Sequence, residues 1–282
     1  TNEFNNEGTV TTLNNQGAFD QGITNKNGGA ITDLTNDGTI TNGITNESGG
    51  EIGTITNNQN IDKIDNSGNI TKVDNNATIT ELTNVANAKI ETFDNQGNVT
   101  NAFTNEGTID NLNNNTGGTL NDVTNAGTGN IGTLKNEGTL NGTLTNENGG
   151  TIGTIDNSSN ITRIDNQEGG TITNLNNNAT GQIDVFDNSG SVTNDFRNEG
   201  QITTLNNNAT GSMNNLTNAT NASIGTLTNE GTLTGGITNE TNAQIDSIMN
   251  RNDLDTINNA GTITSIANES GATITTINNQ ST

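Results

Sequence analysis

The amino-acid sequence predicts an all-β fold, a right-handed parallel β-solenoid in which short strands stack coil upon coil. An aliphatic residue or Phe followed two positions later by Asn recurs from end to end, as in Leu227-Thr228-Asn229. Each of these units has a second apolar residue four or six positions after its Asn, as at Leu233. Polar residues fill the places between them, which gives the period-2 alternation of a strand.

About 28 such units, each 9 to 11 residues long, follow one another along the 282 residues. A single unit cannot bury its apolar edge, whereas stacked units can. The repeat therefore predicts that equivalent strands pair in parallel one coil apart. The usual rule for parallel crossovers makes the solenoid right-handed. No shift in composition interrupts the rhythm, which indicates a single repeat domain over residues 1–282.

Two places in each unit are candidates for the bends of a coil, and only the first breaks the alternation, because the gap from the Asn to the second apolar residue is always even. One is the step of three or four residues from the second apolar residue to the first apolar residue of the next unit. The other lies between the Asn and the second apolar residue, where some units carry two-residue insertions, as in the stretches Asn25–Gly29 and Asn146–Gly150. Gly and Asn tolerate positive φ and suit a corner. The sequence does not decide which of these bends is sharper.

Regularities among the units favour three units, about 30 residues, per coil and about nine coils. The stretch FDNQGNVTNAFTNEG from Phe93 matches FDNSGSVTNDFRNEG from Phe186, so we expect three higher-order copies, at 4–92, 93–185 and 186–276. One match disagrees, because residues 38–66 resemble residues 138–166 at an offset of ten units, which three does not divide. Two units per coil therefore stays open as the alternative.

The recurrent Asn predicts a structural ladder inside the solenoid. The alternation places it on the same side as the apolar residues, where stacked amides can hydrogen-bond from coil to coil. A ligand-binding role is disfavoured because function rarely needs the same residue in every unit. With three units per coil, one ladder would contain Asn15, Asn46, Asn75, Asn105, Asn136, Asn166, Asn198, Asn229 and Asn259.

Composition excludes several classes of partner and cofactor. The chain has 8 basic and 31 acidic residues and a net charge of -23, which argues against nucleic acid and anionic membrane surfaces. No apolar run reaches the ~18–20 residues of a membrane-spanning helix. No Cys is present for disulfides or thiolate metal sites. The Asp of calcium-binding nonapeptide repeats is missing, so we expect no cofactor or metal beyond weak calcium binding by scattered surface carboxylates.

Catalysis is not expected. Parallel β-helix polysaccharide lyases, which have a similar architecture, use clustered Asp, a basic residue and aromatic sugar platforms, whereas this chain has no Trp or Tyr. Lys72 and Arg163 each stand two residues before an Asp, which predicts surface charge pairs of little energetic value. The six Phe residues all occupy apolar unit positions and are expected in the core.

Outward threonines provide the strongest alternative to a purely structural role. Thr-x-Thr ladders resemble those of insect-type ice-binding β-helices, although outward Thr is also simply a good strand residue. Here the motif occurs in all three series of units, so no single face would carry an unbroken array. The pairs are Thr9/Thr11, Thr39/Thr41, Thr78/Thr80, Thr171/Thr173, Thr232/Thr234, Thr262/Thr264 and Thr273/Thr275. A binding module for ice or a glycan, using an outward Thr/Asn face, is thus the second functional hypothesis.

The repeated Leu/Ile-Thr-Asn-x-Gly-Thr-Ile pattern resembles the passenger repeats of bacterial autotransporters and of filamentous-haemagglutinin-like adhesins. This resemblance covers essentially the whole chain. It implies a β-helix exported to the bacterial cell surface or the extracellular space. The expected function is that of a structural shaft of a surface adhesin, or of a subunit that stacks end to end into a filament. A glycan or protein receptor on a host or other surface is a further class of partner that the resemblance allows.

The two ends of the repeat array carry no atypical polar unit that would cap them. Such ends expose strand edges and apolar side chains that recruit further strands. Phe4 is expected near one end, and Ile274 and Ile277 near the other. Ile277-Asn278-Asn279 and Phe4-Asn5-Asn6 both have the apolar-x-Asn pattern of the repeat, so the two ends are compatible in sequence. The sequence therefore predicts either continuation into further repeats or head-to-tail self-association, a contact that does not close.

Overall fold

A computed structural model describes residues 3–280, and all of its regular structure is β-strand. The predicted fold class is confirmed: the chain is a parallel β-solenoid with about 14 turns. It divides into two compact units, Thr1–Gly142 and Thr143–Thr282. Within residues 3–280 there is no helix with the length and apolarity that spanning a membrane requires.

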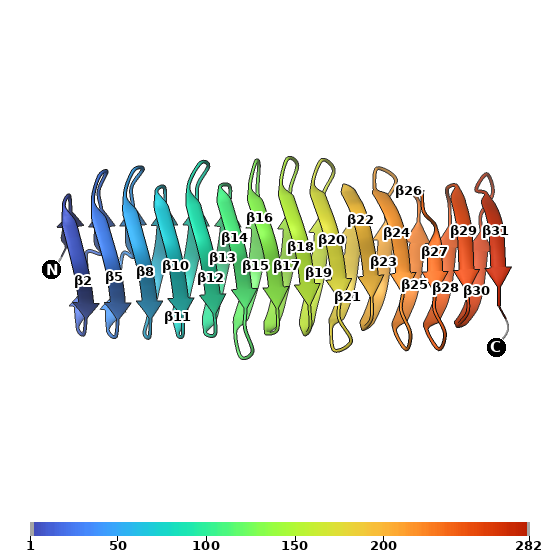
Figure 1. The fold of residues 1–282 in the computed structure, drawn as a ribbon, viewed down its shortest axis with the longest axis horizontal. Helices are drawn as coiled ribbons and strands as arrows, with labels where there is room; N and C mark the ends of the chain where they lie inside the picture. Colours follow the sequence, from blue (N-terminus) through green and yellow to red (C-terminus); the bar gives the residue numbers. More distant parts are fainter. Residues whose placement is uncertain (1–2, 281–282) are drawn as a thin grey trace. The chain divides into compact units, whose positions relative to one another are not determined.

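Unit 1 contains two parallel sheets, and consecutive long strands of the chain alternate between them (Figure 1). Sheet A of unit 1 contains β1 (Phe4–Asn6), β4 (Ile23–Asn25), β7 (Ile44–Asn46), β9 (Ile61–Asn66), β11 (Thr78–Asn84), β13 (Asn98–Asn105) and β15 (Thr119–Asn125), with the short β3 (Ala18–Phe19) and β6 (Thr39–Ile40). Sheet B of unit 1 contains β2 (Thr9–Asn15), β5 (Ala30–Asn36), β8 (Glu51–Asn57), β10 (Asn69–Asn75), β12 (Lys89–Asn95), β14 (Thr108–Asn114) and β16 (Asn130–Asn136).

Unit 2 has the same organisation. Its sheet A contains β19 (Asn160–Asn166), β21 (Gln182–Asn188), β23 (Gln201–Asn207), β25 (Ser223–Asn229), β28 (Gln244–Asn250) and β30 (Thr262–Asn268). Its sheet B contains β18 (Thr151–Asn157), β20 (Thr171–Asn177), β22 (Ser191–Asn198), β24 (Ser212–Asn218), β26 (Thr232–Leu233), β27 (Ile237–Asn239), β29 (Leu254–Asn259) and β31 (Ile274–Asn279). Strand β17 (Thr139–Asn146) includes the residues at which the two units divide.

Each coil contains two repeat units, not three. Val73 of β10 pairs with Ile55 of β8 on one side and with Phe93 of β12 on the other, and each of these partners is two units away in sequence. The expectation of three units and about nine coils is therefore wrong, and the alternative of two units per coil is correct. The ten-unit offset between residues 38–66 and 138–166 is even, so equivalent residues of these two segments occupy corresponding sheets.

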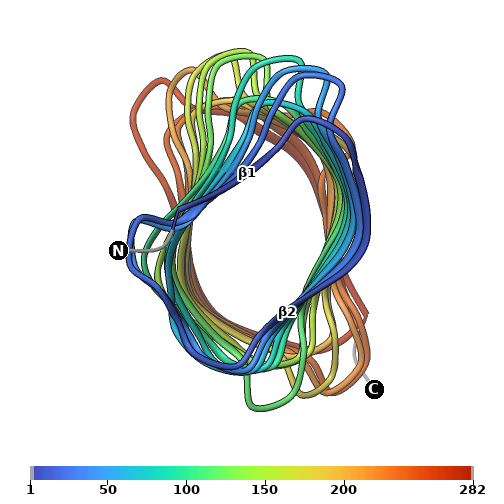
Figure 2. The same cartoon turned by 90° about the vertical axis from the view of Figure 1, so that its left-hand side faces the viewer.

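The reason lies in where the chain bends. Strand β10 buries its second, fifth and seventh residues, which are Ile70, Val73 and Asn75. Thr71 and Lys72 lie between the first two of these, and the register with both neighbouring strands skips Thr71. The three-residue step between apolar residues is thus a bend inside one strand and does not form a corner. The chain reverses direction after the Asn, so two walls of strands are enough to close a coil (Figure 2).

The reversals use Gly or Asn where the backbone enters the left-handed region. In the turn after Asn25, Gly28 has a φ of 78° and the Gly29 amide donates to the Lys26 carbonyl at 2.8 Å. In other turns of the same length an Asn takes this position, as at Asn221, with a φ of 66°. Residues other than Gly and Asn are strained there, which explains the composition of the insertions.

The core consists of rows of aliphatic residues between the two sheets, and pairs of Phe bridge it. Phe93 and Phe103 lie on consecutive strands of opposite sheets, with ring centroids 5.0 Å apart and an interplanar angle of 88°. Phe186 and Phe196 form an equivalent pair at 4.9 Å. These four side chains are fully buried, as expected for core residues, whereas Phe4 and Phe19 are half-buried. Because Phe93 lies in a sheet B and Phe186 in a sheet A, the matching FDN segments occupy opposite kinds of sheet.

Candidate functional site: asparagine ladders and outward faces

The most regular polar feature is a ladder of buried Asn amides in each sheet. Asn75 accepts a hydrogen bond on Oδ1 from Asn57 Nδ2 at 2.8 Å and donates from Nδ2 to Asn95 Oδ1 at 2.7 Å. The ladder contacts described within each unit measure 2.7 to 3.0 Å. In unit 1 the ladders are Asn6, Asn25, Asn46, Asn66, Asn84, Asn105 and Asn125 in sheet A, and Asn15, Asn36, Asn57, Asn75, Asn95, Asn114 and Asn136 in sheet B.

The ladder Asn residues named from the sequence all belong to such ladders, but not to a single one. Asn15 donates to Asn36 and not to Asn46, because its neighbour is two units away. Asn46 instead accepts from Asn25. Of the nine residues, Asn46, Asn105, Asn166 and Asn229 lie in sheets A, and Asn15, Asn75, Asn136, Asn198 and Asn259 lie in sheets B.

The same amides also hold the turns. Asn25 Nδ2 donates to the Gly29 carbonyl within its own turn at 3.1 Å, as well as to Asn46 in the ladder. Gly29 leaves no room for a side chain, because an added Cβ would lie 2.6 Å from Asn25 Oδ1. Among the described residues, every buried side-chain nitrogen and oxygen has a hydrogen-bond partner. The buried amides of the ladders are therefore all hydrogen-bonded within the chain.

Outward Thr pairs are divided between the two kinds of sheet. Thr9/Thr11 lies on β2 of sheet B and Thr78/Thr80 begins on β11 of sheet A, both in unit 1. In unit 2, Thr171/Thr173 lies on a sheet B strand and Thr262/Thr264 on a sheet A strand. On β8, β10 and β12, which follow β2 and β5 in sheet B, the equivalent pairs are Glu51/Gly53, Asn69/Thr71 and Lys89/Glu91. No regular Thr array therefore covers this sheet.

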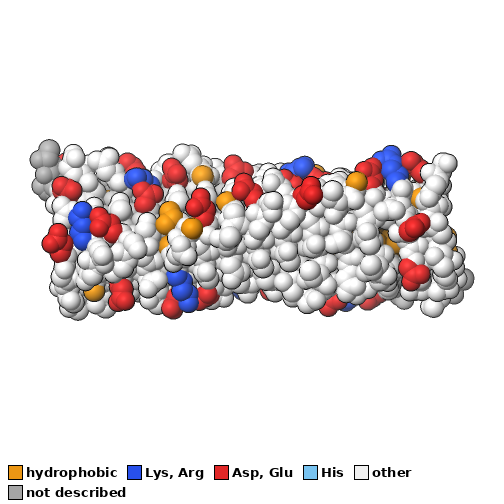
Figure 3. Space-filling model, turned by 90° about the horizontal axis from the view of Figure 1, so that it is seen from above, with side chains coloured by type: hydrophobic (Ala, Val, Ile, Leu, Met, Phe, Trp, Pro, Cys, Tyr) orange, Lys and Arg blue, Asp and Glu red, His pale blue; other side chains and the backbone are white. Residues whose placement is uncertain are grey.

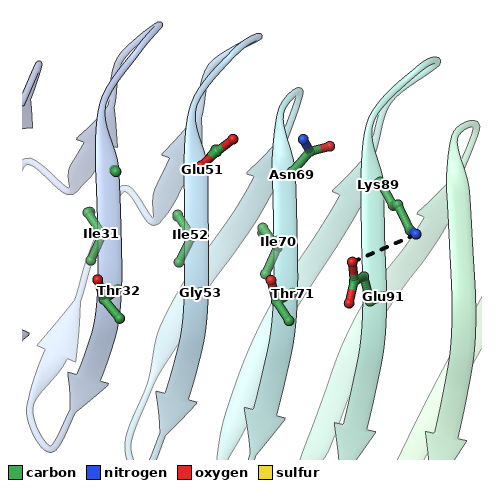
Figure 4. Close-up of a pocket in the computed structure, with 11 residues that line it drawn as sticks. Ile31, Thr32, Glu51, Ile52, Gly53, Asn69, Ile70, Thr71, Lys89 and Glu91 are labelled. Carbon is green, nitrogen blue, oxygen red and sulfur yellow. Dashed lines mark ion pairs between the residues drawn. The ribbon is translucent and has the colours of Figure 1, made fainter. Parts of the chain in front are cut away.

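An open groove of about 390 Å³ lies over these strands of sheet B in unit 1 (Figure 4). It follows the outward residues that flank the inward Ile of each strand, and the small residues Ala30 and Gly53 are among those that line it. Hydroxyl, carboxylate and amide groups line it, and Lys89 Nζ lies 3.8 Å from Glu91 at one end. The sequence reasoning missed this groove; the small residues at Ala30 and Gly53 were the available signal. It contains no aromatic platform for a sugar ring.

Each of the eight basic side chains has a carboxylate partner. On the face shown in Figure 3, basic groups stand beside acidic ones at several scattered places. Lys72 bridges Asp74 at 2.8 Å and Asp94, one coil away, at 3.1 Å. Arg163 pairs with Asp187 of the next coil. The basic side chains are 37 to 48% exposed, so each pair contributes little stability. Within residues 3–280 no cluster of three acidic groups could hold a metal ion.

Glu240, in the turn after β27, is a carboxylate with partners in two other coils. Its Oε2 accepts from the backbone N–H of Thr220 at 2.9 Å and from the Thr220 hydroxyl at 3.0 Å. Arg197 Nη1 lies 3.3 Å from its Oε1. The Thr220 backbone donor is the largest cause that holds the pKa of Glu240 below its usual value, and the Thr220 hydroxyl and Arg197 act in the same direction. This arrangement joins three coils, with Arg197 on strand β22 and with Thr220 and Glu240 in the turns after β24 and β27.

The two ends of the array expose parts of the aliphatic rows. Phe4 is half-buried, and its ring contacts Phe19 edge-on at 6.3 Å between centroids. At the other end Ile274 is half-buried, Ile277 is 51% exposed and Ile266 is 37% exposed. A hollow of about 210 Å³ opens there, lined by Asn259, Ile263, Ile266, Ile277 and Asn279. The sequence reasoning did not single out Ile266.

Comparison of the chain with family models, with curated proteins and with solved structures found no match.

Proposed function

We propose that this chain is a structural repeat protein, the shaft of a surface adhesin or a subunit of an end-to-end filament. One observation carries the proposal: the contacts of the inward side chains are mainly with the equivalent side chains of the neighbouring coils. The Asn amides bond to the coils before and after them, and the aliphatic residues pack in rows. Apart from Asp187, the buried polar side chains of the described residues are Asn amides.

The proposed location is extracellular or at a bacterial cell surface. Its support is the resemblance of the Leu/Ile-Thr-Asn-x-Gly-Thr-Ile pattern to autotransporter and filamentous-haemagglutinin-like passenger repeats. If the location is right, external protease or antibody should reach the protein on intact cells that produce it. Labelling only after lysis would contradict the location while leaving the structural role in place.

Force spectroscopy on the 282-residue chain tests the structural role. A shaft resists extension and then loses coils in steps, because each coil is bonded mainly to its neighbours. Releasing one coil of about 20 residues lengthens the chain by roughly 70 Å. Extension without such steps, at the forces that stretch an unstructured chain, would overturn the proposal.

Ice or glycan binding is the alternative, and outward Thr pairs on both kinds of sheet argue against an ice-binding face. A shaft predicts no thermal hysteresis in ice assays and no retention on a glycan array. The groove of Figure 4 is the place where a glycan-binding result would be mapped, with Thr32→Lys and Thr71→Lys as blocking variants. Binding that these variants abolish would replace the shaft proposal with a binding module.

A further inference from the structure

The coil formed by β30 and β31 is built to accept a further coil. Ile266 and Ile277 close the two aliphatic rows at this end and are 37% and 51% exposed, although their equivalents one coil earlier, Ile248 and Ile257, are fully buried. The hollow of about 210 Å³ lies between these rows. A further coil with apolar residues at the same places would fill it and cover both Ile side chains.

The first coil of the chain has the matching residues. Phe4 of β1 occupies the position in sheet A that corresponds to Ile266, and Leu13 of β2 the position in sheet B that corresponds to Ile277. Val10 corresponds in the same way to Ile274. Phe4, Val10 and Leu13 are only half-buried, in contrast to the middle of each unit. The strand order also fits, because the last strand, β31, belongs to a sheet B and the first, β1, to a sheet A.

The described hydrogen bonds of the Asn ladders all run in one direction along the chain, so the two ends of the array differ. In every ladder contact described, Nδ2 of one Asn donates to Oδ1 of the Asn in the following coil. At the end of the array the corresponding Asn residues, Asn268 and Asn279, are exposed. At the start, Oδ1 of Asn6 and of Asn15 accept only a long local bond of 3.2 Å, from Gly8 and Gly17 respectively. One end therefore presents amide donors and the other presents acceptors.

The backbone repeats this polarity. The residue after each ladder Asn donates its N–H to the carbonyl of the ladder Asn one coil earlier, as Lys26 does to Asn6 and Gln280 does to Asn259, both at 2.8 Å. The N–H groups of Glu7 and Gln16 occupy the donor places at the start of the array. The carbonyls of Asn268 and Asn279 occupy the acceptor places at its end.

We propose that the β30–β31 coil binds the β1–β2 coil of a second copy of this chain, in register, so that both Asn ladders and both aliphatic rows pass from one copy to the next. This inference rests on the proposed structural function and names its partner. The contact is head to tail and does not close, so it propagates into a filament. Side-chain amide bonds and apolar contacts form it, and no ion pair is required.

Register-specific crosslinking tests the geometry, and the chain has no Cys of its own to interfere. In the stack Ala267 lies beside Asn5, and Asn278 beside Asn14, on neighbouring parallel strands about 4.8 Å apart. That spacing suits a disulfide between the two Cα positions. Mixing an Ala267→Cys chain with an Asn5→Cys chain, or Asn278→Cys with Asn14→Cys, should give disulfide dimers under mild oxidation. The mismatched mixture of Ala267→Cys with Asn14→Cys is the control and should give at least tenfold less. Equal yields in matched and mismatched mixtures would overturn the register.

Sedimentation over a concentration series tests the contact itself. The Ile277→Glu variant should lower the association constant at least tenfold, whereas Thr276→Glu, the neighbouring outward position, should change it less than twofold. Circular dichroism on both variants confirms the fold. Equal effects of the two variants, or a wild-type chain that stays monomeric at high concentration, would overturn the proposal. A monomeric chain that still unfolds stepwise under force would leave the shaft function intact.

Discussion

An Asn side chain suits the inward position at the end of a strand because it is both donor and acceptor. Asn75 uses its Oδ1 toward Asn57 and its Nδ2 toward Asn95, while the same Nδ2 contacts the Ala77 carbonyl in its own turn at 3.1 Å. An Asp there would offer acceptors only and place like charges one coil apart in a buried row. A Leu would leave its neighbours' amides without partners. The residue type is therefore fixed by the stacking itself.

Replacing Asn75 by Ala should cost about 1–3 kcal/mol in the free energy of unfolding, because Asn95 loses its donor and Asn57 its ladder acceptor in a buried row. Asn69→Ala, an exposed residue of the same strand, is the matched control and should change stability by less than about 0.5 kcal/mol. Urea unfolding of both variants measures the difference. If both variants lost the same free energy of unfolding, the buried ladder hydrogen bonds would contribute no more to stability than an exposed Asn does.

Glu240 offers a local test of the hydrogen bonds that depress a pKa. Its folded-state pKa lies below the unfolded value, so its contribution to stability is present above the unfolded pKa and is lost as pH falls through the folded pKa. Thr220→Val removes the hydroxyl donor and should raise the pKa of Glu240 toward its ordinary value, as followed by carboxyl NMR. Thr241→Val, in an exposed part of the same turn as Glu240, should not move it. An unchanged pKa in Thr220→Val would rule out the hydroxyl as a cause.

At the scale of the strand and turn, the sequence predicts which side chains point inward better than it predicts where the chain turns from one sheet to the other. Period-2 alternation correctly placed Val73 and Asn75 inward, since any one-residue slip would expose the apolar set. The bend at Thr71 could not be ranked against the turn after Asn75, because broken alternation indicates the first and only Gly- and Asn-rich turn chemistry indicates the second. The ladder partners were misassigned for this reason: Asn15 bonds to Asn36 in a two-unit coil, although the residue type and position were right.

Two units per coil and three units per coil bury the same residues, so the apolar pattern cannot choose between them. Repeat matches also mislead, because the FDN segments at Phe93 and Phe186 are nine units apart and nine is odd. In a two-unit coil an odd offset moves a segment to the other kind of sheet, and both kinds accept it since their inward positions are alike. The groove over Ala30 and Gly53 likewise depends on which strands become neighbours, which only the coil size determines.

The turn after Asn25 allows a test of backbone conformation that is free of packing effects. Gly28 has a φ of 78°, and a Cβ added to it would meet nothing within 4 Å. Gly28→Ala should therefore cost about 1 kcal/mol from the left-handed backbone alone, and Gly28→Asn should cost less because Asn tolerates this region. Urea unfolding of the two variants gives the comparison. If Asn proves as costly as Ala, the occurrence of Asn at position 221 in an equivalent turn needs another explanation.

On the scale of the whole molecule, charge opposes the self-association that the end coils favour. The net charge is -23, and copies of the chain therefore repel one another. In the proposed stack Glu7 of one copy would also stand over Glu269 of the other, beside Arg251, which lies 3.1 Å from Glu269. Because the remaining contacts are amide and apolar, screening should remove the repulsion and leave the attraction.

The association constant should therefore rise by about an order of magnitude between 0.01 and 0.1 M salt, where the Debye length falls from about 30 Å to about 10 Å. Glu7→Gln should raise association at low salt and reduce the salt dependence, while Ile277→Glu should keep the chain monomeric at both salt concentrations. Sedimentation velocity on the three chains at matched concentrations measures these effects. Association that weakens as salt is added would mean that ion pairs hold the copies together, and the proposed contact through ladders and aliphatic rows would then be wrong.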